Sequence, residues 1–294
     1  MTVIGIFGPT ASGKSRVAEA VAERLPAELV SADAMQVYRG LPILTDQSPA
    51  RLVAIWPLDH EASVGEYAPL AHAAIDEIVA AGRTPVVVGG TGLYLRAALT
   101  ELGLPPAPPP GARARWEAVY DADPVDAHAR LAEIDPAAAA AVHPNDRRRV
   151  VRALELADAG ASLVPDADRL WAAETRRPTL LVGLDVPLVE LQGRIESRTR
   201  AMFEAGVEEE VRGALAQPIS TTARKTLGLD EIAELPREEA IEAVAARTRR
   251  YAAYQRKWMR RVPGLVMVDA DRPPGEIADD IVAMARTRER LSRR

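Results

Sequence analysis

Short apolar runs without polar alternation recur along the N-terminal third of the chain. The runs, with the residues at which they stop, are 2–7 before Gly8, 28–31 before Asp33, and 84–88 before Gly89. Helical spacing of apolar positions starts near Lys14 and recurs over 67–81. Uniformly apolar strands separated by helices predict an α/β fold in which helices cover both faces of a parallel sheet. Ligands of such sheets lie beyond the carboxyl ends of the strands, which is where the three runs stop.

A proline-rich segment at 104–111 is the sharpest change of composition in the chain. It fits neither a helix nor a central strand, so we place a domain boundary there. Residues 112–175 are rich in alanine and arginine with helical spacing, and they predict a small all-helical insertion domain. Prolines interrupt this spacing at four positions, namely Pro124, Pro136, Pro144 and Pro165.

The segments 1–111 and 176–294 are then expected to form the catalytic core around the insertion. The second segment predicts a further core strand at 180–184 and a last strand at 266–269. Apolar spacing predicts a helix that passes through Leu191, followed by two more helices before the last strand.

Composition and charge narrow the classes of function. No apolar run approaches the roughly 20 residues of a membrane span, and the N-terminus lacks the basic region of a signal peptide, so we expect no membrane contact. The absence of cysteine excludes thiolate nucleophiles and cysteine zinc sites, and it fits a reducing, cytoplasmic setting. With 37 basic and 42 acidic residues the net charge is −5, so any site for a polyanion must be local.

Residues Gly8–Ser15 match the phosphate-loop pattern at every fixed position, directly between a strand and a helix. In such a P-loop, backbone N–H groups bind phosphate oxygens, Lys14 reaches the terminal phosphates, and Ser15 is placed to hold Mg²⁺, the expected cofactor. The strand at 84–88 lacks the terminal aspartate typical of ATPases, which favours a transferase, although Asp33 could supply that acid. The loop consists of Gly8, Pro9, Thr10, Ala11, Ser12, Gly13, Lys14 and Ser15.

Four ordered sequence blocks together resemble the tRNA dimethylallyltransferase family, also known as the IPP transferases. The blocks are Gly8–Ser15, Ser31–Gly40, Gly89–Tyr94 and His143–Glu155. Later pieces at 194–211 and 248–258 also fit, so the resemblance covers nearly the whole chain. The phosphate loop is shared with many families, whereas the third and fourth blocks are much more specific.

The resemblance implies transfer of a dimethylallyl group from dimethylallyl diphosphate to N6 of the adenosine at position 37 of tRNA, with release of diphosphate. The P-loop would then hold a prenyl diphosphate rather than ATP. Asp33 would be the general base, Thr91 would lie beside the reacting centre, and Arg198 would point at the diphosphate. Structural interpretations compete with these roles: a turn or cap aspartate, a strand-end cap, and a solvated helix arginine. We expect a monomer.

The resemblance also implies contacts with the tRNA anticodon stem-loop, whose target base is flipped out of its stack. Arg148 and Arg152 lie four residues apart on one helix face and would contact stem phosphates. A solvated face with an Arg152–Glu155 pair is the structural alternative. The residues implied in tRNA contact are Asp33, Ala34, Met35, Gln36, Thr91, Arg113, Arg148, Arg149 and Arg152.

A segment at 247–261 carries seven cationic residues and no acidic one, which is a local footprint for a polyanion. Its aromatic residues Tyr251, Tyr254 and Trp258 have helical spacing, and we interpret them as a core stripe rather than a base-stacking platform. The chain departs from the family pattern at Ala34, where the family has serine, and over 41–60. We expect these departures to alter the contacts with tRNA more than the binding of phosphate.

Three other functions stay open. An isopentenyltransferase acting on free adenylate would need neither the arginine-rich helix nor a sizeable insertion. A small-molecule or nucleoside kinase would consume ATP at the same loop. A non-enzymatic RNA-binding module would show no turnover of prenyl diphosphate.

Overall fold

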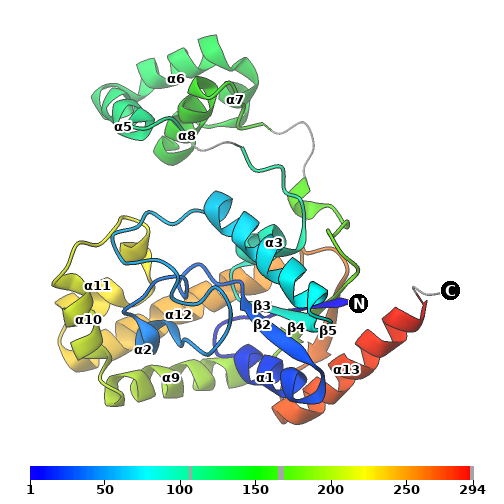
Figure 1. The fold of residues 1–294 in the computed structure, drawn as a ribbon. Helices are drawn as coiled ribbons and strands as arrows, with labels where there is room; N and C mark the ends of the chain where they lie inside the picture. The colour runs from blue at the N-terminus through cyan, green and yellow to red at the C-terminus, as the bar shows by residue number, and fades with distance from the viewer. Residues whose placement is uncertain (106–107, 165–168, 292–294) are drawn as a thin grey trace. The chain divides into compact units, whose positions relative to one another are not determined.

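The computed structural model describes most of the chain, namely residues 1–105, 108–164 and 169–291. Its contacts divide the chain into two compact units. The larger unit comprises Met1–Glu101 with Trp171–Arg294, and the smaller unit comprises Leu102–Leu170. The larger unit combines a sheet with helices, and the smaller unit is built of helices (Figure 1).

These units correct the predicted bounds of the insertion, 112–175. The proline-rich segment belongs to the smaller unit, and the segment from Trp171 onward belongs to the larger one. The C-terminal boundary lies earlier than predicted because the ring of Trp171 packs on that of Trp258, with ring centroids 4.8 Å apart. The chain leaves and re-enters the larger unit at one place, where the N–H of Arg176 donates to the carbonyl of Leu99 over 2.9 Å.

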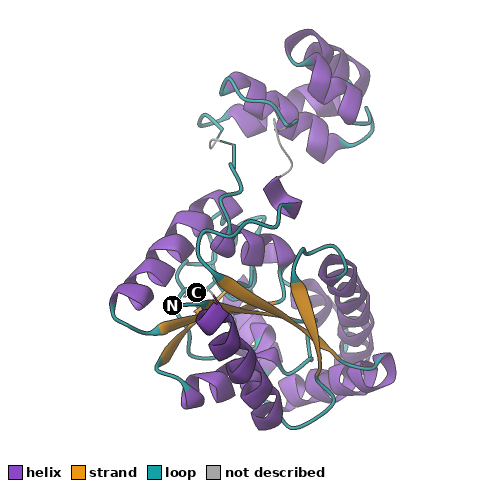
Figure 2. Cartoon of the chain, turned by 90° about the vertical axis from the view of Figure 1, so that its right-hand side faces the viewer, coloured by secondary structure: helices purple, strands orange, loops and turns teal. Residues whose placement is uncertain are grey.

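The strands of the larger unit form a sheet (Figure 2). Its five strands follow the order β2-β3-β1-β4-β5, and every neighbouring pair is parallel. The strands are β1 (Val3–Phe7), β2 (Ala27–Ser31), β3 (Thr84–Gly89), β4 (Thr179–Asp185) and β5 (Leu265–Asp269). All five predicted strands are therefore confirmed to within one residue at each end. Phe7 pairs with Gly89 and with Gly183, so the loops after β1 and β3 emerge side by side.

Helices cover both faces of this sheet, as predicted. Helices α1 and α13 pack against each other on one face (Figure 1). Helices α3 and α4 pack together on the other face. The α-helices of the larger unit are α1 (Lys14–Arg24), α2 (Pro42–Thr45), α3 (Val64–Ala80), α4 (Gly92–Leu99), α9 (Leu188–Glu204), α10 (Val207–Leu215), α11 (Leu229–Glu234), α12 (Arg237–Met259) and α13 (Pro274–Leu291). Two short 3₁₀ turns are η1 (Arg169–Trp171) and η2 (Ala223–Lys225).

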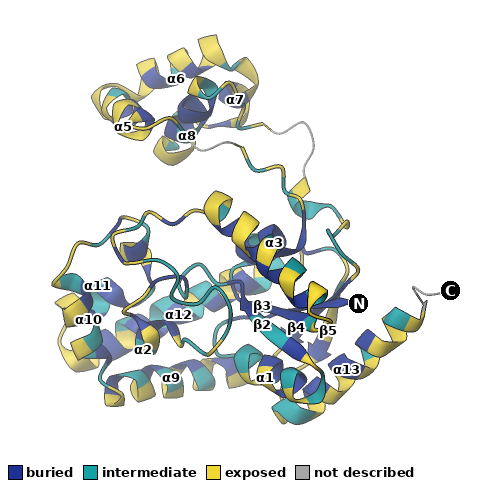
Figure 3. Ribbon diagram, viewed as in Figure 1, coloured by how far each residue is buried: buried dark blue, intermediate teal, exposed yellow. Residues whose placement is uncertain are grey.

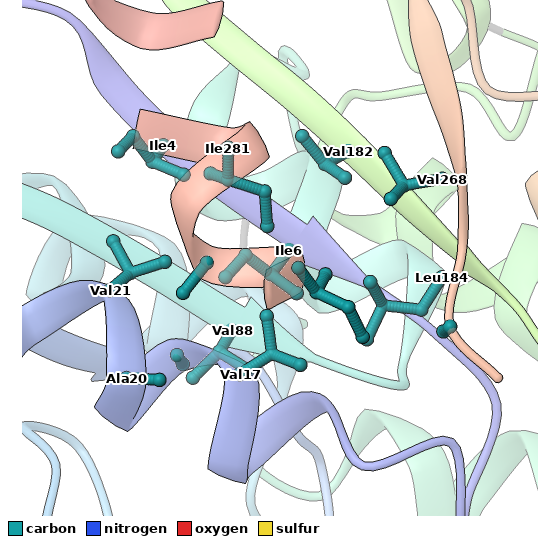
Figure 4. Close-up of a cluster of buried hydrophobic side chains, with 14 of the residues drawn as sticks. Ile4, Ile6, Val17, Ala20, Val21, Val88, Val182, Leu184, Val268 and Ile281 are labelled. Carbon is teal, nitrogen blue, oxygen red and sulfur yellow. The ribbon is translucent and has the colours of Figure 1, made fainter. Parts of the chain in front are cut away.

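Successive residues of β1 point to opposite faces of the sheet, so the strand packs against the helices on both faces. Ile4 and Ile6 pack in a cluster with Ile281 of α13 (Figure 4). Gly5 faces the other layer, where an added Cβ would lie 3.1 Å from Cδ1 of Leu99 in α4. The strand is buried over its full length (Figure 3). A close-packed core of this kind fixes the strand ends, and with them the loops that follow.

The smaller unit is all helical, in agreement with the prediction. Its helices are α5 (Ala112–Ala122), α6 (Pro124–Ile134), α7 (Pro136–Ala141) and α8 (Arg147–Asp158). Pro124 and Pro136 occupy first helical positions, where a missing N–H is tolerated, and the side chains of Asp123 and Asp135 accept backbone hydrogen bonds as caps. The predicted break at Pro165 lies outside the described residues. The buried core includes Trp116, Tyr120, Leu131 and Leu154.

The second half of the chain contains more helices than its sequence pattern predicted. Two helices were expected between α9 and β5, but the structure has α10, α11 and α12. Gly206 and Gly228, with φ of 91° and 96°, precede α10 and α11 and divide the chain there. Helices α2, α4 and α13 were not predicted either. Among the described residues, no helix is both long and apolar enough to cross a membrane.

Candidate active site

The Gly8–Ser15 loop leads from β1 directly into α1. Its backbone turns through positive φ at Ala11 (63°) and Gly13 (83°), and the N–H of Ser12 donates to the carbonyl of Pro9 over 3.2 Å. This geometry is typical of loops whose successive N–H groups face an anion. The buried hydroxyl of Ser12 has no hydrogen-bond partner among the described residues, so it is available to a ligand.

Lys14 and Ser15 begin α1 and line a pocket at the carboxyl edge of the sheet. Burial lowers the pKa of Lys14, Arg198 acts in the same direction, and attraction to Asp33 opposes both. A cation held in such a desolvated position interacts more strongly with an anionic ligand than a solvated lysine does.

Gln255 of α12 joins the two loops that emerge beside each other from the sheet. Its Oε1 accepts from the N–H of Thr10 over 2.8 Å, and its Nε2 donates to the carbonyl of Gly90 over 2.8 Å. The side chain is buried, and a Cβ on Gly90 would lie 2.4 Å from Nε2, so the close approach requires glycine. No sequence pattern indicates this role of the glutamine, because its partners lie far away in the chain.

Asp33 and Thr91 lie on adjacent loops after β2 and β3. Oδ1 of Asp33 accepts the N–H of Met35 over 3.0 Å, which is the turn contact that the structural interpretation predicted. No described residue donates a hydrogen bond to Oδ2. Thr91 occupies the N-cap position of α4 without a side-chain cap bond, and its Oγ1 accepts the N–H of Ala34 over 3.2 Å instead. The hydroxyl of Tyr251 lies 3.5 Å from the same atom.

Arg198 of α9 points at the P-loop rather than into solvent. Its Nη1 donates to Oγ1 of Thr10 over 2.8 Å, and its Nη2 lies 3.6 Å from Oδ2 of Asp46. The structural interpretation of Arg198 as a solvated helix residue is therefore wrong. Gln36 holds the loop that carries Asp46, because its Nε2 donates to the carbonyls of Thr45 and Asp46 over 3.1 and 2.9 Å.

A single pocket collects most of these groups, although Thr91 is not among the residues that line it. Its polar lining includes Thr10, Lys14, Ser15, Asp33, Gln36 and Arg198, and Met35 also contributes. Aliphatic side chains from separate segments complete it: Leu44, Ile195, Met202, Leu227 and Val244. The sequence carries no signature of this aliphatic lining, because the lining comes from α2, α9, α12 and the loop before α11, which no motif connects. The pocket can hold a molecule with an anionic end and a small apolar end.

The donor set of the pocket fits Mg²⁺ better than a softer metal. The described residues contain no group of three or more His, Asp or Glu side chains that could hold a metal ion. The pocket does offer hard oxygen donors in Ser15, Asp33 and Asp46. Few protein oxygens, supplemented by water and phosphate oxygens, are the usual environment of Mg²⁺.

In the smaller unit, one carboxylate holds two of the predicted tRNA-contact arginines. Glu155 is fully buried, and it accepts from Arg113 Nε over 2.7 Å and from Arg152 Nη1 over 3.1 Å. The Arg152–Glu155 pair of the structural alternative is thus present. Arg148 and Arg149 are exposed and form no ion pair with the described residues, so their charges are available to a partner.

Comparison with known proteins agrees with this geometry. The family model described as IPP transferase matches residues 36–262. The tRNA dimethylallyltransferase of Thermobifida fusca is 41% identical, with 92% of this chain and 91% of the relative covered. The tRNA dimethylallyltransferase of Anaeromyxobacter dehalogenans is also 41% identical, with 95% of this chain and 98% of the relative covered.

Solved structures give the same assignment. The full-length tRNA isopentenylpyrophosphate transferase of Bacillus halodurans is 30% identical with a TM-score of 0.69, covering 100% of this chain and 99% of that one. A eukaryotic dimethylallyltransferase acting on tRNA shares the fold at 24% identity and a TM-score of 0.79, covering 100% and 80%. The resemblance seen in the sequence is confirmed, and the chain belongs to the IPP transferase family.

Proposed function

We propose that this protein transfers a dimethylallyl group from dimethylallyl diphosphate to N6 of the adenosine at position 37 of tRNA and releases diphosphate. The observation that carries the proposal is the single pocket that joins the P-loop and Arg198 to Asp33 and an aliphatic wall. The names of the relatives support the same reaction. The proposal places the enzyme in the cytoplasm, acting as a monomer.

The diphosphate would bind to the N–H groups of the P-loop, to Lys14 and to Arg198. Negative charge grows on it as the C–O bond to the prenyl carbon breaks, so these groups stabilise the transition state more than the ground state. Mg²⁺ bound beside Ser15 would neutralise part of the diphosphate charge. The five-carbon apolar group suits the aliphatic lining formed by residues such as Leu44 and Val244.

Asp33 is proposed as the base for the exocyclic amine. As the bond between N6 and the prenyl carbon forms and the C–O bond breaks, one N6 proton passes to the carboxylate. Oδ1 already accepts the N–H of Met35, so Oδ2 is the oxygen open to the amine. Thr91 fixes the neighbouring backbone at Ala34 and places its own hydroxyl beside Tyr251.

The tRNA would contact both units. Ala34, Met35 and Gln36 extend from Asp33 along the loop that would face the flipped base. In the smaller unit, Arg113, Arg148, Arg149 and Arg152 would meet phosphates of the anticodon stem.

The test is incubation of the protein and Mg²⁺ with labelled dimethylallyl diphosphate and unmodified tRNA, AMP or ATP in separate reactions. We expect label in tRNA alone, and at least about a hundredfold loss in Asp33→Asn. Asp59→Asn is the matched control, because Asp59 is exposed. Label in AMP alone, or consumption of ATP without prenyl transfer, would contradict the proposal.

A further inference from the structure

Helix α2 is a single turn that depends on the rest of the larger unit for its position. A helix this short is not stable alone, and its first N–H groups have no acceptor within it. Glu210 of α10 supplies these acceptors. Its Oε2 accepts from the N–H of Ile43 over 2.7 Å, and its Oε1 accepts from the N–H of Leu44 over 2.8 Å. Both oxygens of this carboxylate are therefore used to hold the backbone of α2.

Glu210 differs from the two glutamates that precede it in α10. Glu208 and Glu209 each form an ion pair with an arginine in contact with solvent. Glu210 is half-buried and forms no ion pair with any described residue. Burial raises the pKa of Glu210, and the two backbone donors oppose this shift. A carboxylate withdrawn from water is thus stabilised here by the backbone of α2 alone.

Leu44, one of the two residues that Glu210 holds, contributes to the aliphatic lining of the pocket. Its side chain is buried and packs on Gly228, where an added Cβ would lie 3.2 Å from Cδ1 of Leu44 and 3.4 Å from Val244. Close packing of this kind leaves the side chain little room to move while its backbone is held. Glu210 itself is not among the residues that line the pocket.

Leu44 also belongs to the segment 41–60, where the chain departs from the family pattern. We expected these departures to alter mainly the contacts with tRNA. In the structure, however, Leu44 and Asp46 of this segment line the pocket that holds the P-loop lysine. The departures therefore reach the donor site as well, and a branched aliphatic side chain occupies part of its apolar end.

We infer that Leu44, held in place by Glu210, limits the prenyl donor to a five-carbon chain, which makes Glu210 a positioning residue for the reaction. An apolar pocket discriminates between alkyl chains through the space that its walls leave. A wall that can shift accepts a longer chain, so the discrimination depends on what fixes the wall. This inference rests on the proposed function and specifies the donor class of the same pocket.

The first test compares dimethylallyl diphosphate with geranyl diphosphate, whose chain has ten carbons, as donors to unmodified tRNA. The unaltered protein should prefer the shorter donor by at least about a hundredfold in kcat/KM. Glu210→Gln leaves one oxygen to accept from two N–H groups, so the preference should fall about tenfold while the KM for tRNA is unchanged. Glu209→Gln, at an exposed position of the same helix, is the matched control and should keep the preference.

The second test asks whether Glu210 acts through Leu44. Leu44→Ala opens the wall directly and should lower the same preference. Adding Glu210→Gln to Leu44→Ala should then change the preference little, because residues that act through one contact are not additive. If Glu210→Gln lowers kcat/KM equally for both donors, or if the two substitutions act independently, the inference is overturned.

Two further outcomes keep folding and function apart. If circular dichroism shows that Glu210→Gln does not fold, Glu210→Asp replaces it, because aspartate keeps the charge but is one methylene shorter and should lower the preference in the same direction. Equal use of both donors by the unaltered protein would overturn the inference alone. If the unaltered protein transfers no prenyl group to tRNA from either donor, the proposed function itself fails.

Discussion

The pocket of the larger unit and the arginine cluster of the smaller unit hold their cations in different ways. At the pocket, neutral amides fix the loops: Gln255 joins Thr10 to Gly90, and Gln36 holds the loop at Asp46. In the smaller unit, a buried charge, Glu155, fixes two arginines.

The difference has an electrostatic consequence. A neutral positioning residue adds no negative field near the P-loop beyond that of Asp33 and Asp46, so it does not weaken the attraction of Lys14 and Arg198 for a diphosphate. A carboxylate shared by two arginines offsets part of their positive charge and holds both side chains in a fixed place. We infer that strong anion binding is reserved for the pocket, while the arginine cluster makes a weaker, positioned contact.

The largest effect is expected from Gln255→Glu, which gives the pocket the charged arrangement of the smaller unit. Oxygen in place of Nε2 removes the donor to Gly90, and a negative charge arises next to the P-loop. We expect kcat/KM for dimethylallyl diphosphate to fall by about a hundredfold, since an unsatisfied buried group and charge repulsion together cost about 3 kcal/mol. Gln217→Glu, which adds the same charge at an exposed position, is the control. An unchanged kcat/KM would refute the role of the neutral amide.

The pH dependence of the pocket should show the lowered pKa of Lys14. Because burial lowers this pKa, the lysine loses its charge at a lower pH than a solvated lysine does. Measured against pH, kcat/KM should therefore fall on the alkaline side before pH 10.5, the ordinary lysine value. The variant Lys14→Arg, which stays charged, should have lower activity without this alkaline fall. The same alkaline fall in Lys14→Arg would assign it to another group.

The reverse exchange, Glu155→Gln, should destabilise the smaller unit. Two arginines would then face a neutral amide and each other. Because Arg113 is 60% exposed, solvent screens much of this repulsion, and we expect about 1–2 kcal/mol. Urea unfolding followed through Trp116 fluorescence measures it, with the exposed Glu133→Gln as control. Equal stabilities of the two variants would mean that Glu155 does not hold the cluster.

The smallest expected effects come from substituting two adjacent arginines of α8, which differ in their ion pairs. Arg148 is exposed without an ion pair to a described residue, whereas Arg147 pairs with Asp121 and Glu117. Arg148→Ala should raise the KM for tRNA a few-fold and leave the melting temperature unchanged. Arg147→Ala should instead lower stability by less than about 1 kcal/mol with little effect on KM. The opposite pattern would exchange their roles.

The sequence predicted the sheet of this molecule well, because buried parallel strands are local apolar runs that end in glycine or aspartate. It also predicted the P-loop, whose contacts run within eight residues. It could not predict the role of Gln255, whose partners are at 10 and 90, or the aliphatic lining from Leu44 to Val244. These depend on tertiary packing, as does Tyr254, which is 55% exposed although its spacing predicted a core stripe. Helical spacing places a residue on a face without saying what covers that face.

The hydrogen bond between Arg176 and Leu99 has an evolutionary consequence. This bond joins the two chain segments of the larger unit at the point where the smaller unit is inserted. The smaller unit is therefore a loop whose ends the larger unit already holds together. The free-energy cost of closing such a loop, which is entropic, rises by only about 0.6 kcal/mol when the length of the loop doubles. Descendants of this fold could therefore lengthen, shorten or exchange the helical unit, and so acquire new acceptors, while the sheet and its pocket stay as they are.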